Sequence, residues 1–279
     1  MKQRKHYCFI GAGSMAEAIL GGLTKSRRAD ANGIHVINRC DRDRLTQLKN
    51  HYSIQCPEEK EKAVTRAETI ILAVKPKDMA DALDQWGGLI RPGQRVISVA
   101  AGISTAFIEE RIASGVAVIR AMPNTSSMIG RSATAICGGR HAAKSDLEEA
   151  VADFSSIGST VIVDEKDMDT VTGLSGSGPA YIYYFVEALE QAGVREGLSH
   201  QVARQLTLQT LVGAAHMLLE TGEDPAELRR KVTSPGGTTM AAIETLADHH
   251  FHQALQSAVH RARKRSEELG QVFTPSAAK

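Results

Sequence analysis

The chain has 279 residues, of which 42% are hydrophobic and 23% charged, and its formal net charge is +1. Such values are typical of globular proteins, and the length suggests two domains. The near-neutral charge gives no reason to expect nucleic acid or an anionic membrane as a partner. Apolar runs stay short of the roughly 20 residues of a membrane span. The basic residues before residue 7 precede a run broken by glycines, so we expect no signal peptide.

Cysteine and histidine patterns point away from a disulfide framework or a metal site. The four cysteines show no Cys-x-x-Cys spacing: Cys8, Cys40, Cys56 and Cys137. We therefore expect reduced thiols in a cytoplasmic protein. His249, His250 and His252 lack metal-ligand spacing and carboxylate neighbours, which favours a solvated helix end and no bound metal.

Short apolar runs alternate with helical patterns up to residue 164. The runs predict strands over residues 7–10, 34–37, 69–74, 95–101, 116–120, 132–137 and 159–163. The patterns between them predict helices up to residue 23 and over residues 41–51, 57–66, 78–89, 105–113 and 144–154. This alternation predicts an α/β fold whose amino-terminal half is a doubly wound Rossmann domain with right-handed crossovers.

Beyond Asp164 the pattern is helical only. Helices are expected over residues 167–174, 180–192, 199–219, 225–232, 240–247 and 251–269, and the tail from Thr274 has no core pattern. We predict an NADP-binding Rossmann domain over residues 1–164 and an all-α domain over residues 165–279. The helix at 199–219 is apolar on more than one face, so we expect it to be buried on several sides. Pairing with a second copy would bury it, which favours a homodimer over a self-sufficient bundle.

The stretch from residue 7 to residue 16 has the order strand, tight turn, helix. Gly11 allows the sharp turn, Gly13 leaves room for a pyrophosphate to approach the backbone, and Ala16 lets the helix pack close to the strand. The helix start offers free N–H groups and a positive dipole end to phosphates. This pattern predicts a dinucleotide site, although a tight turn without a ligand has the same glycine spacing.

Three further strand ends carry suitable residues, and ligands of open α/β sheets lie outside the carboxyl ends of the strands. Asn38 and Arg39 follow the second strand, where the adenosine ribose lies in such folds. A polar and a cationic residue in place of an acidic one suit a 2′-phosphate, which favours NADPH over NADH. The segments at 75–76 and 100–102 end two more strands, and each taken alone is equally an ordinary connection.

Two segments of the second half are rich in glycine and hydroxyl groups. In the loop at 234–239, adjacent glycines expose backbone N–H groups just before a helix, which predicts a carboxylate site. The hydroxyls of Ser234, Thr238 and Thr239 add hydrogen-bonding groups there. A helix-to-helix turn with hydroxyl caps fits the same spacing. The segment at 175–179 either shapes a pocket between the domains or is a flexible entry to the next helix.

Together these motifs resemble the pyrroline-5-carboxylate reductases over essentially the whole chain. The resemblance rests on the stretches Phe9-Ile-Gly-Ala-Gly-Ser-Met-Ala16, Ala73-Val-Lys-Pro76, Met122-Pro-Asn-Thr125, Ser175-Gly-Ser-Gly-Pro-Ala180 and Val232-Thr-Ser-Pro-Gly-Gly-Thr-Thr239. The last stretch lies in the family's signature region and is the most specific. The chain departs from the family pattern at Lys60, Lys231, Ser126 and Ala247.

The resemblance implies reduction of (S)-1-pyrroline-5-carboxylate to L-proline, the last step of proline synthesis. NADPH is usually preferred to NADH in the family, and the homodimer is often assembled further into a decamer. With Asn38 and Arg39 from the second strand end, the residues expected to line the dinucleotide are Ile10, Gly11, Ala12, Gly13, Ser14, Met15, Lys60, Ala73, Val74, Lys75, Pro76, Val99, Ala100 and Ala101. The substrate carboxylate is expected on Ser234 and the backbone of Gly237 and Thr238, and Thr239 is expected to face the imine nitrogen as the catalytic residue.

The chemistry expected is hydride transfer from nicotinamide C4 to the imine carbon, for which the protein supplies alignment and electrostatics. One alternative is reduction of another cyclic imine or of a hydroxy acid on the same scaffold. A hydroxy-acid dehydrogenase usually needs a positioned Lys or His, whereas the loop at 234–239 offers hydroxyls and amides. The other alternative is a non-catalytic dinucleotide sensor, which would bind NADPH without oxidising it.

Overall fold

The computed structural model describes residues 5–271, so the tail from Thr274 lies outside the described residues. The described residues up to 177 and from 260 onward form one compact unit, and residues 178–259 form a second. By compactness alone, the segment at 165–177 and the end of the last helix therefore group with the sheet. The division after residue 164 into two functional domains stays a prediction.

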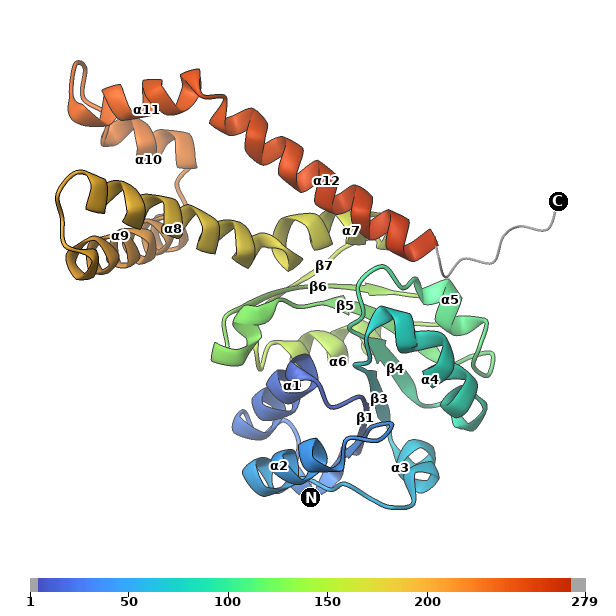
Figure 1. Ribbon diagram of the computed structural model, residues 1–279. Coiled ribbons are helices and arrows are strands. Elements are labelled where there is room, and N and C mark those ends of the chain that lie inside the picture. Colours follow the sequence, from blue (N-terminus) through green and yellow to red (C-terminus); the bar gives the residue numbers. More distant parts are fainter. Residues whose placement is uncertain (1–4, 272–279) are drawn as a thin grey trace. The chain divides into compact units, whose positions relative to one another are not determined.

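The first unit is built on one seven-stranded sheet with the order β2-β1-β3-β4-β5-β6-β7 (Figure 1). The strands are β1 (Tyr7–Ile10), β2 (Ile34–Ile37), β3 (Thr69–Leu72), β4 (Arg95–Ser98), β5 (Ala117–Met122), β6 (Ser132–Gly138) and β7 (Gly158–Ile162). The chain moves from β1 to β2 on one side and then to β3 on the other. That reversal creates the crevice in which ligands of doubly wound folds bind, and the expected Rossmann architecture is confirmed.

Strand β6 departs from the regular alternation because it runs antiparallel to β5. The connection from β5 to β6 holds only the short 3₁₀ segment η4 (Thr125–Ile129). A parallel neighbour needs a crossover of a dozen or more residues, so this short connection reverses the chain direction. Strand β7 is parallel to β6, and α6 (Lys144–Phe154) connects the two strands.

Helices cover both faces of the sheet, and each face has its own apolar core. On one face, α1 (Ser14–Lys25), α2 (Arg42–Tyr52) and α6 pack against the side of β1 that carries Tyr7 and Phe9. On the other face, α3 (Lys60–Arg66), α4 (Met79–Trp86) and α5 (Thr105–Glu109) pack against the side that carries Cys8 and Ile10. Burial on both faces explains why the strands read as continuous apolar runs.

Some predicted helix bounds were wrong. The helix expected from residue 57 begins at Lys60, because the chain at Gln55 is still extended and bridges to His35 beside β2. The helix expected over 78–89 is α4 flanked by the 3₁₀ turns η2 (Pro76–Asp78) and η3 (Gly87–Leu89). The remaining short elements of this unit are η1 (Ala31–Gly33), η5 (Glu165–Asp167), α7 (Met168–Val171) and the π-helical turn η6 (Thr172–Gly176).

The second unit is entirely helical. It contains α8 (Gly178–Arg195), α9 (His200–Thr221), α10 (Pro225–Lys231), α11 (Thr238–Asp248) and the first turns of α12 (Phe251–Gln271). Within residues 178–259, Ala203 is the one fully buried side chain. In the single chain, α9 is therefore largely exposed rather than buried on several sides. Among residues 5–271, no helix is both long and apolar enough to cross a membrane.

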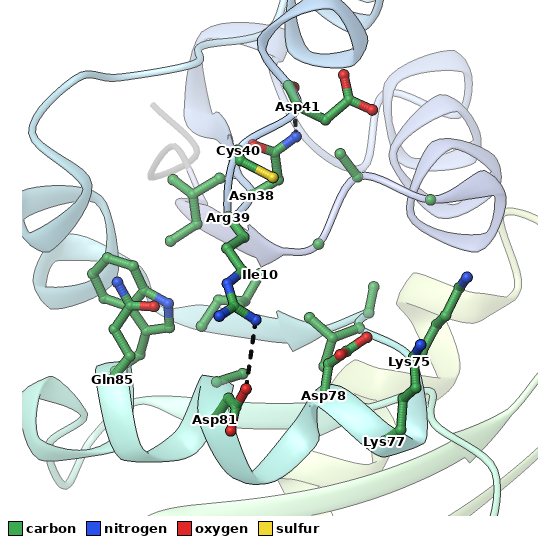
Figure 2. A pocket seen from close by; sticks show the side chains of 18 of the residues that line it. Ile10, Asn38, Arg39, Cys40, Asp41, Lys75, Lys77, Asp78, Asp81 and Gln85 are labelled. Atoms are coloured by element: carbon green, nitrogen blue, oxygen red, sulfur yellow. Dashed lines mark hydrogen bonds and ion pairs between the residues drawn. The ribbon is translucent and has the colours of Figure 1, made fainter.

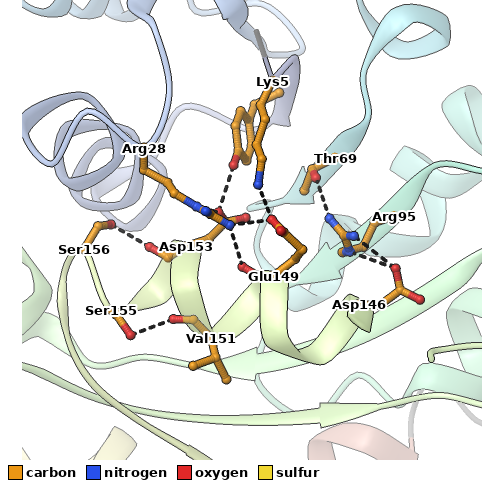
Figure 3. A network of polar contacts seen from close by, with 11 residues as sticks. Lys5, Arg28, Thr69, Arg95, Asp146, Glu149, Val151, Asp153, Ser155 and Ser156 are labelled. Carbon is orange, nitrogen blue, oxygen red and sulfur yellow. Dashed lines mark hydrogen bonds and ion pairs between the residues drawn. The ribbon is translucent and has the colours of Figure 1, made fainter. Parts of the chain in front are cut away.

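A polar cluster fastens the amino end of β1 to α6 (Figure 3). The buried hydroxyl of Tyr7 donates a 2.8 Å hydrogen bond to Asp153, and Nε of Arg28 donates to the same carboxylate at 2.7 Å. Lys5 and Arg28 both pair with Glu149. Burial raises the pKa of Asp153 and, together with the nearby Asp153 carboxylate, raises the pKa of Tyr7. This cluster lies at the amino end of β1. Ligands of open α/β sheets bind at the opposite, carboxyl ends of the strands.

Candidate functional site

The turn after β1 has the geometry that the glycine spacing predicts. Gly11 adopts φ +111°, and a Cβ there would lie 2.5 Å from the carbonyl oxygen of Ala73, just beyond β3. A Cβ at Gly13 would meet no atom within 4 Å, so the space beside this residue is open. Gly13 is also the N-cap of α1, whose first N–H groups have no intrahelical partner. The turn therefore offers amide donors, a positive dipole end and clearance for a phosphate group.

A cavity of about 1000 Å³ lies at the carboxyl ends of β1, β2 and β3 (Figure 2). Nine of the expected dinucleotide residues line it: Ile10, Gly11, Ala12, Gly13, Asn38, Arg39, Ala73, Val74 and Lys75. The sheet order brings these segments together, because β1 lies between β2 and β3. The size of the cavity, the open glycine turn and the N-terminus of α1 all fit a dinucleotide bound where the strand order reverses.

The remaining expected dinucleotide residues lie outside this cavity lining. Ser14 and Met15 form the start of α1, and Pro76 opens η2. The segment at 99–101, which holds Val99, Ala100 and Ala101, follows β4, the next strand along the same edge of the sheet. Lys60 lies beside the cavity at the start of α3, where its ammonium donates a 2.8 Å hydrogen bond to the carbonyl of Asn38.

Hydrogen bonds hold the loop after β2 in place at one end of the cavity. The Asn38 amide donates to the carbonyl of Asp41 at 2.6 Å, and the Asp41 carboxylate caps α2 by accepting from the backbone of Arg44 at 2.9 Å. Nε of Arg44 donates to the carbonyl of Ala12 at 2.9 Å, which ties α2 to the glycine turn. The loop that carries Arg39 is thus supported from both sides.

Sequence reasoning missed several residues of the cavity lining, most of which lie on helices. The additional lining residues are Ile37, Cys40, Asp41, Arg44, Lys77, Asp78, Asp81, Ala82, Asp84, Gln85 and Trp86. Six of these, from Asp78 onward, belong to α4 or to its N-cap. The spacing of Asp78, Asp81 and Gln85 at three and four residues is the signal that would have placed them on one helix face.

The loop before α11 holds the expected substrate residues, all in the helical unit. Helix α11 begins at Thr238 rather than near residue 240, with Gly237 as its N-cap. The amides of Thr238 and Thr239 therefore lie in the first helical turn, where N–H groups have no intrahelical partner. The Gly237 N–H donates to the carbonyl of Ser234 at 3.0 Å, and a Cβ at Gly237 would lie 2.7 Å from the Ser234 hydroxyl. Lys231, a departure from the family pattern, forms an ion pair with Glu223.

Two of the motifs that carry the resemblance meet inside the first unit. The Asn124 side chain donates a 3.1 Å hydrogen bond to the carbonyl of Ser175. Ser175 lies in the π-helical turn η6, and such turns are frequent at functional sites. The segment at 175–177 is thus held in an ordered turn at its start. Among residues 5–271, no three His, Cys, Asp or Glu side chains gather as metal ligands.

Comparison with known proteins defines first the class and then the family. Residues 6–102 match the family model described as "NADP oxidoreductase coenzyme F420-dependent", which with the dinucleotide turn places the chain among NADP-dependent oxidoreductases. Residues 165–269 match the model described as "Pyrroline-5-carboxylate reductase dimerisation". The chain belongs to the pyrroline-5-carboxylate reductase family.

Individual relatives support this assignment over nearly the full length. Pyrroline-5-carboxylate reductase 1 of Bacillus subtilis is 42% identical over 99% of this chain and 93% of its own. The structure of a pyrroline-5-carboxylate reductase from Coxiella burnetii has a TM-score of 0.89 at 34% identity, covering 96% of this chain and 99% of that one. The Plasmodium falciparum pyrroline carboxylate reductase, solved with NADP bound, has a TM-score of 0.86 at 27% identity, covering 97% and 99%.

Thiol labelling offers a direct test of the cavity as the cofactor site. Cys40 is exposed and lines the cavity, whereas Cys8 and Cys137 are buried, and burial raises the pKa of each of these two thiols to about 12. We expect iodoacetamide to alkylate Cys40 first in the native protein. NADPH at ten times its Kd should slow that alkylation about tenfold by mass action, as followed by peptide mass spectrometry.

Cys56 serves as the internal control, because it is half-buried and lies outside the cavity lining. Its alkylation rate should be the same with and without NADPH. An unchanged rate at Cys40 under saturating NADPH would place the cofactor elsewhere.

Proposed function

We propose that the chain transfers a hydride from NADPH to the imine carbon of (S)-1-pyrroline-5-carboxylate and releases L-proline, the last step of proline biosynthesis. The observation that carries the proposal is the similarity to a curated pyrroline-5-carboxylate reductase along 99% of the chain. When bound, the reduced nicotinamide supplies the hydride, and NADH is the second donor. The imine nitrogen takes one proton, so the ring C=N bond becomes the secondary amine of proline.

The first unit supports the proposal through its preformed dinucleotide site. The glycine turn and the start of α1 would hold the pyrophosphate, and Asn38 and Arg39 would hold the adenosine end at the cavity. Lys75 and the segment at 99–101 follow the neighbouring strands on the same sheet edge. These residues bind and orient the cofactor, and none of them needs to exchange a proton.

The loop before α11 supports a carboxylate-bearing substrate. The first-turn amides of Thr238 and Thr239 and the hydroxyl of Ser234 are donors suited to a substrate carboxylate. Gly237 contributes by lacking a side chain beside that hydroxyl. The Thr239 hydroxyl would face the imine nitrogen and orient or relay its proton. A protonated imine is already electrophilic, so a strong general acid is not required.

The activity test follows the loss of reduced-nicotinamide absorbance when pyrroline-5-carboxylate is added to the protein with NADPH. We expect stoichiometric formation of proline and oxidised cofactor. Binding of NADPH without its oxidation would contradict the reductase proposal and indicate a dinucleotide sensor. Turnover only with another cyclic imine or a hydroxy acid would show that the substrate is wrong.

Replacing Thr239 by alanine should lower kcat about tenfold, the value of roughly one hydrogen bond made in the transition state. NADPH affinity should change far less, because the hydroxyl serves the substrate. Thr245→Ala is the matched control, since Thr245 lies on the same helix and its hydroxyl donates to the carbonyl of Ala241. Steady-state kinetics that give equal kcat values for the two variants would reject the role of Thr239.

We also infer a homodimer formed through the helical unit, assembled further into a decamer, in the cytoplasm. Large apolar side chains are exposed along α8 and α9: Ile182, Tyr183, Tyr184, Phe185, Leu189, Val202, Leu206, Leu208, Val212, Met217, Leu218 and Leu219. So many exposed large apolar side chains on two neighbouring helices favour an interaction surface. The four free cysteines fit a reducing compartment.

A further inference from the structure

Helix α4 presents an acidic face to the cofactor cavity. Asp81 and Asp84 of this helix and Asp78 at its N-cap all line the cavity, whereas Met79 and Leu83 of the helix are buried in the core against the sheet. The three carboxylates are spaced three residues apart and so follow one side of the helix. An anionic ligand in the cavity therefore meets negative charge on the α4 side.

Arg39 spans the cavity from the end of β2 to this acidic face (Figure 2). Its Nη1 lies 3.5 Å from Oδ2 of Asp81, and the two side chains are 81% and 71% exposed. Neighbouring cations have other partners: Arg44 pairs with Glu17, and Lys60 donates to the carbonyl of Asn38. Among these three cations at the β2 end of the cavity, Arg39 is thus the one that pairs with a carboxylate of α4, namely Asp81.

We propose that Asp81 is a specificity-determining residue that competes with the 2′-phosphate of NADPH for Arg39 and thereby narrows the preference for NADPH over NADH. This inference rests on the proposed function, which places the adenosine end beside Asn38 and Arg39. A bound 2′-phosphate requires the guanidinium to leave Asp81 and leaves that carboxylate facing a second anion. A bound NADH presents a ribose hydroxyl instead, so the Arg39–Asp81 ion pair persists.

The size of the effect follows from the exposure of the pair. Exposed ion pairs contribute little because water and salt screen them. Removing the Asp81 charge should therefore tighten NADPH binding by about two- to fivefold and leave NADH binding nearly unchanged. The gain should shrink as ionic strength rises, because the Debye length falls to about 3 Å at 1 M salt.

The experiment compares Asp81→Asn with Asp84→Asn by fluorescence titration of the full-length protein with NADPH and with NADH. Both substitutions remove one negative charge from the same helix and the same cavity wall, but Asp81 is the partner of Arg39. We expect the NADPH-to-NADH affinity ratio to rise two- to fivefold for Asp81→Asn and to rise clearly less for Asp84→Asn. Equal changes in the two variants, or an unchanged ratio in Asp81→Asn, would overturn the proposal.

A double-mutant cycle tests whether Asp81 acts through Arg39. In an Arg39→Gln background, the Asp81→Asn substitution should raise NADPH affinity clearly less than in the parent, because only the direct repulsion between Asp81 and the 2′-phosphate is then removed. An undiminished gain in that background would mean that Asp81 acts through the general field and would overturn the proposed competition. Because binding is measured without pyrroline-5-carboxylate, a protein that binds both dinucleotides but shows no Asp81 effect refutes only this inference. A protein that binds neither dinucleotide refutes the proposed function as well.

Discussion

Gly11→Ala is expected to lower the free energy of unfolding by about 2–4 kcal/mol and to abolish measurable NADPH binding. Gly11 holds φ +111°, which a residue with a Cβ rarely adopts, and its Cβ would lie 2.5 Å from the carbonyl oxygen of Ala73. Gly11 follows β1 and Ala73 follows β3. The backbone at either residue therefore cannot shift away from the new Cβ without disturbing the pairing of these two strands. Urea unfolding followed by circular dichroism gives the stability change, and fluorescence titration gives the affinity.

Gly13→Ala is the matched control, because its backbone is ordinary and a Cβ there would meet no protein atom within 4 Å. This variant should stay within about 1 kcal/mol of the parent stability, the cost of a poorer N-cap. Its NADPH affinity should nevertheless fall, because the added methyl occupies the space needed by the pyrophosphate. A Gly13→Ala protein that binds NADPH as the parent does would contradict the site at the glycine turn.

Arg120→Met is expected to destabilise the first unit by about 3 kcal/mol, near the lower end of the range for breaking a buried ion pair. The Arg120 side chain is only 4% exposed and lies 3.2 Å from Asp169 and 3.9 Å from Glu165. Asp169 also accepts a 2.7 Å hydrogen bond from Ser266 of α12, so Arg120 links β5 through α7 to the last helix. The lower end applies because the two carboxylates are partly exposed, and because Nε of Arg120 has no partner within residues 5–271.

Arg120→Lys keeps a cation of similar reach and should recover part of the stability in urea unfolding. The double variant Arg120→Met with Asp169→Asn should also be more stable than Arg120→Met alone, because it removes a carboxylate left without its cation. If the lysine and methionine variants are equally stable, the charge of Arg120 is not what stabilises this position.

The sheet and its glycine turn were predictable because local signals and fold rules agree there. The runs at 7–10 and 34–37 are bounded by turn residues and became strands with those limits. The direction of β6 was not predictable from its own composition, because a buried strand reads alike in parallel and antiparallel sheets. Only the length of the connection through η4 distinguishes the two.

In the candidate site, too, some residues were predictable from the sequence and others were not. Loop residues such as Asn38 and Lys75 were found because the edge of the sheet at which ligands bind is fixed by topology. Asp81 and Trp86 were missed because their access to the cavity depends on how α4 is rotated about its axis. That rotation is set by which residues of the helix the sheet buries, namely Met79 and Leu83. The roles of Ser234 and Thr239 stay predictions until ligand-binding and kinetic measurements test them.

The fastening of Tyr7 and Lys5 to α6 has a consequence for how the chain folds as it is made. Synthesis releases the amino end first, yet the hydroxyl of Tyr7 finds its acceptor only 146 positions later, at Asp153. In a nascent chain that ends before α6, the amino end of β1 lacks these contacts and is exposed to solvent. We therefore expect amino-terminal fragments that end before α6 to lack this polar anchor of β1 and to bind chaperones more than the full chain does.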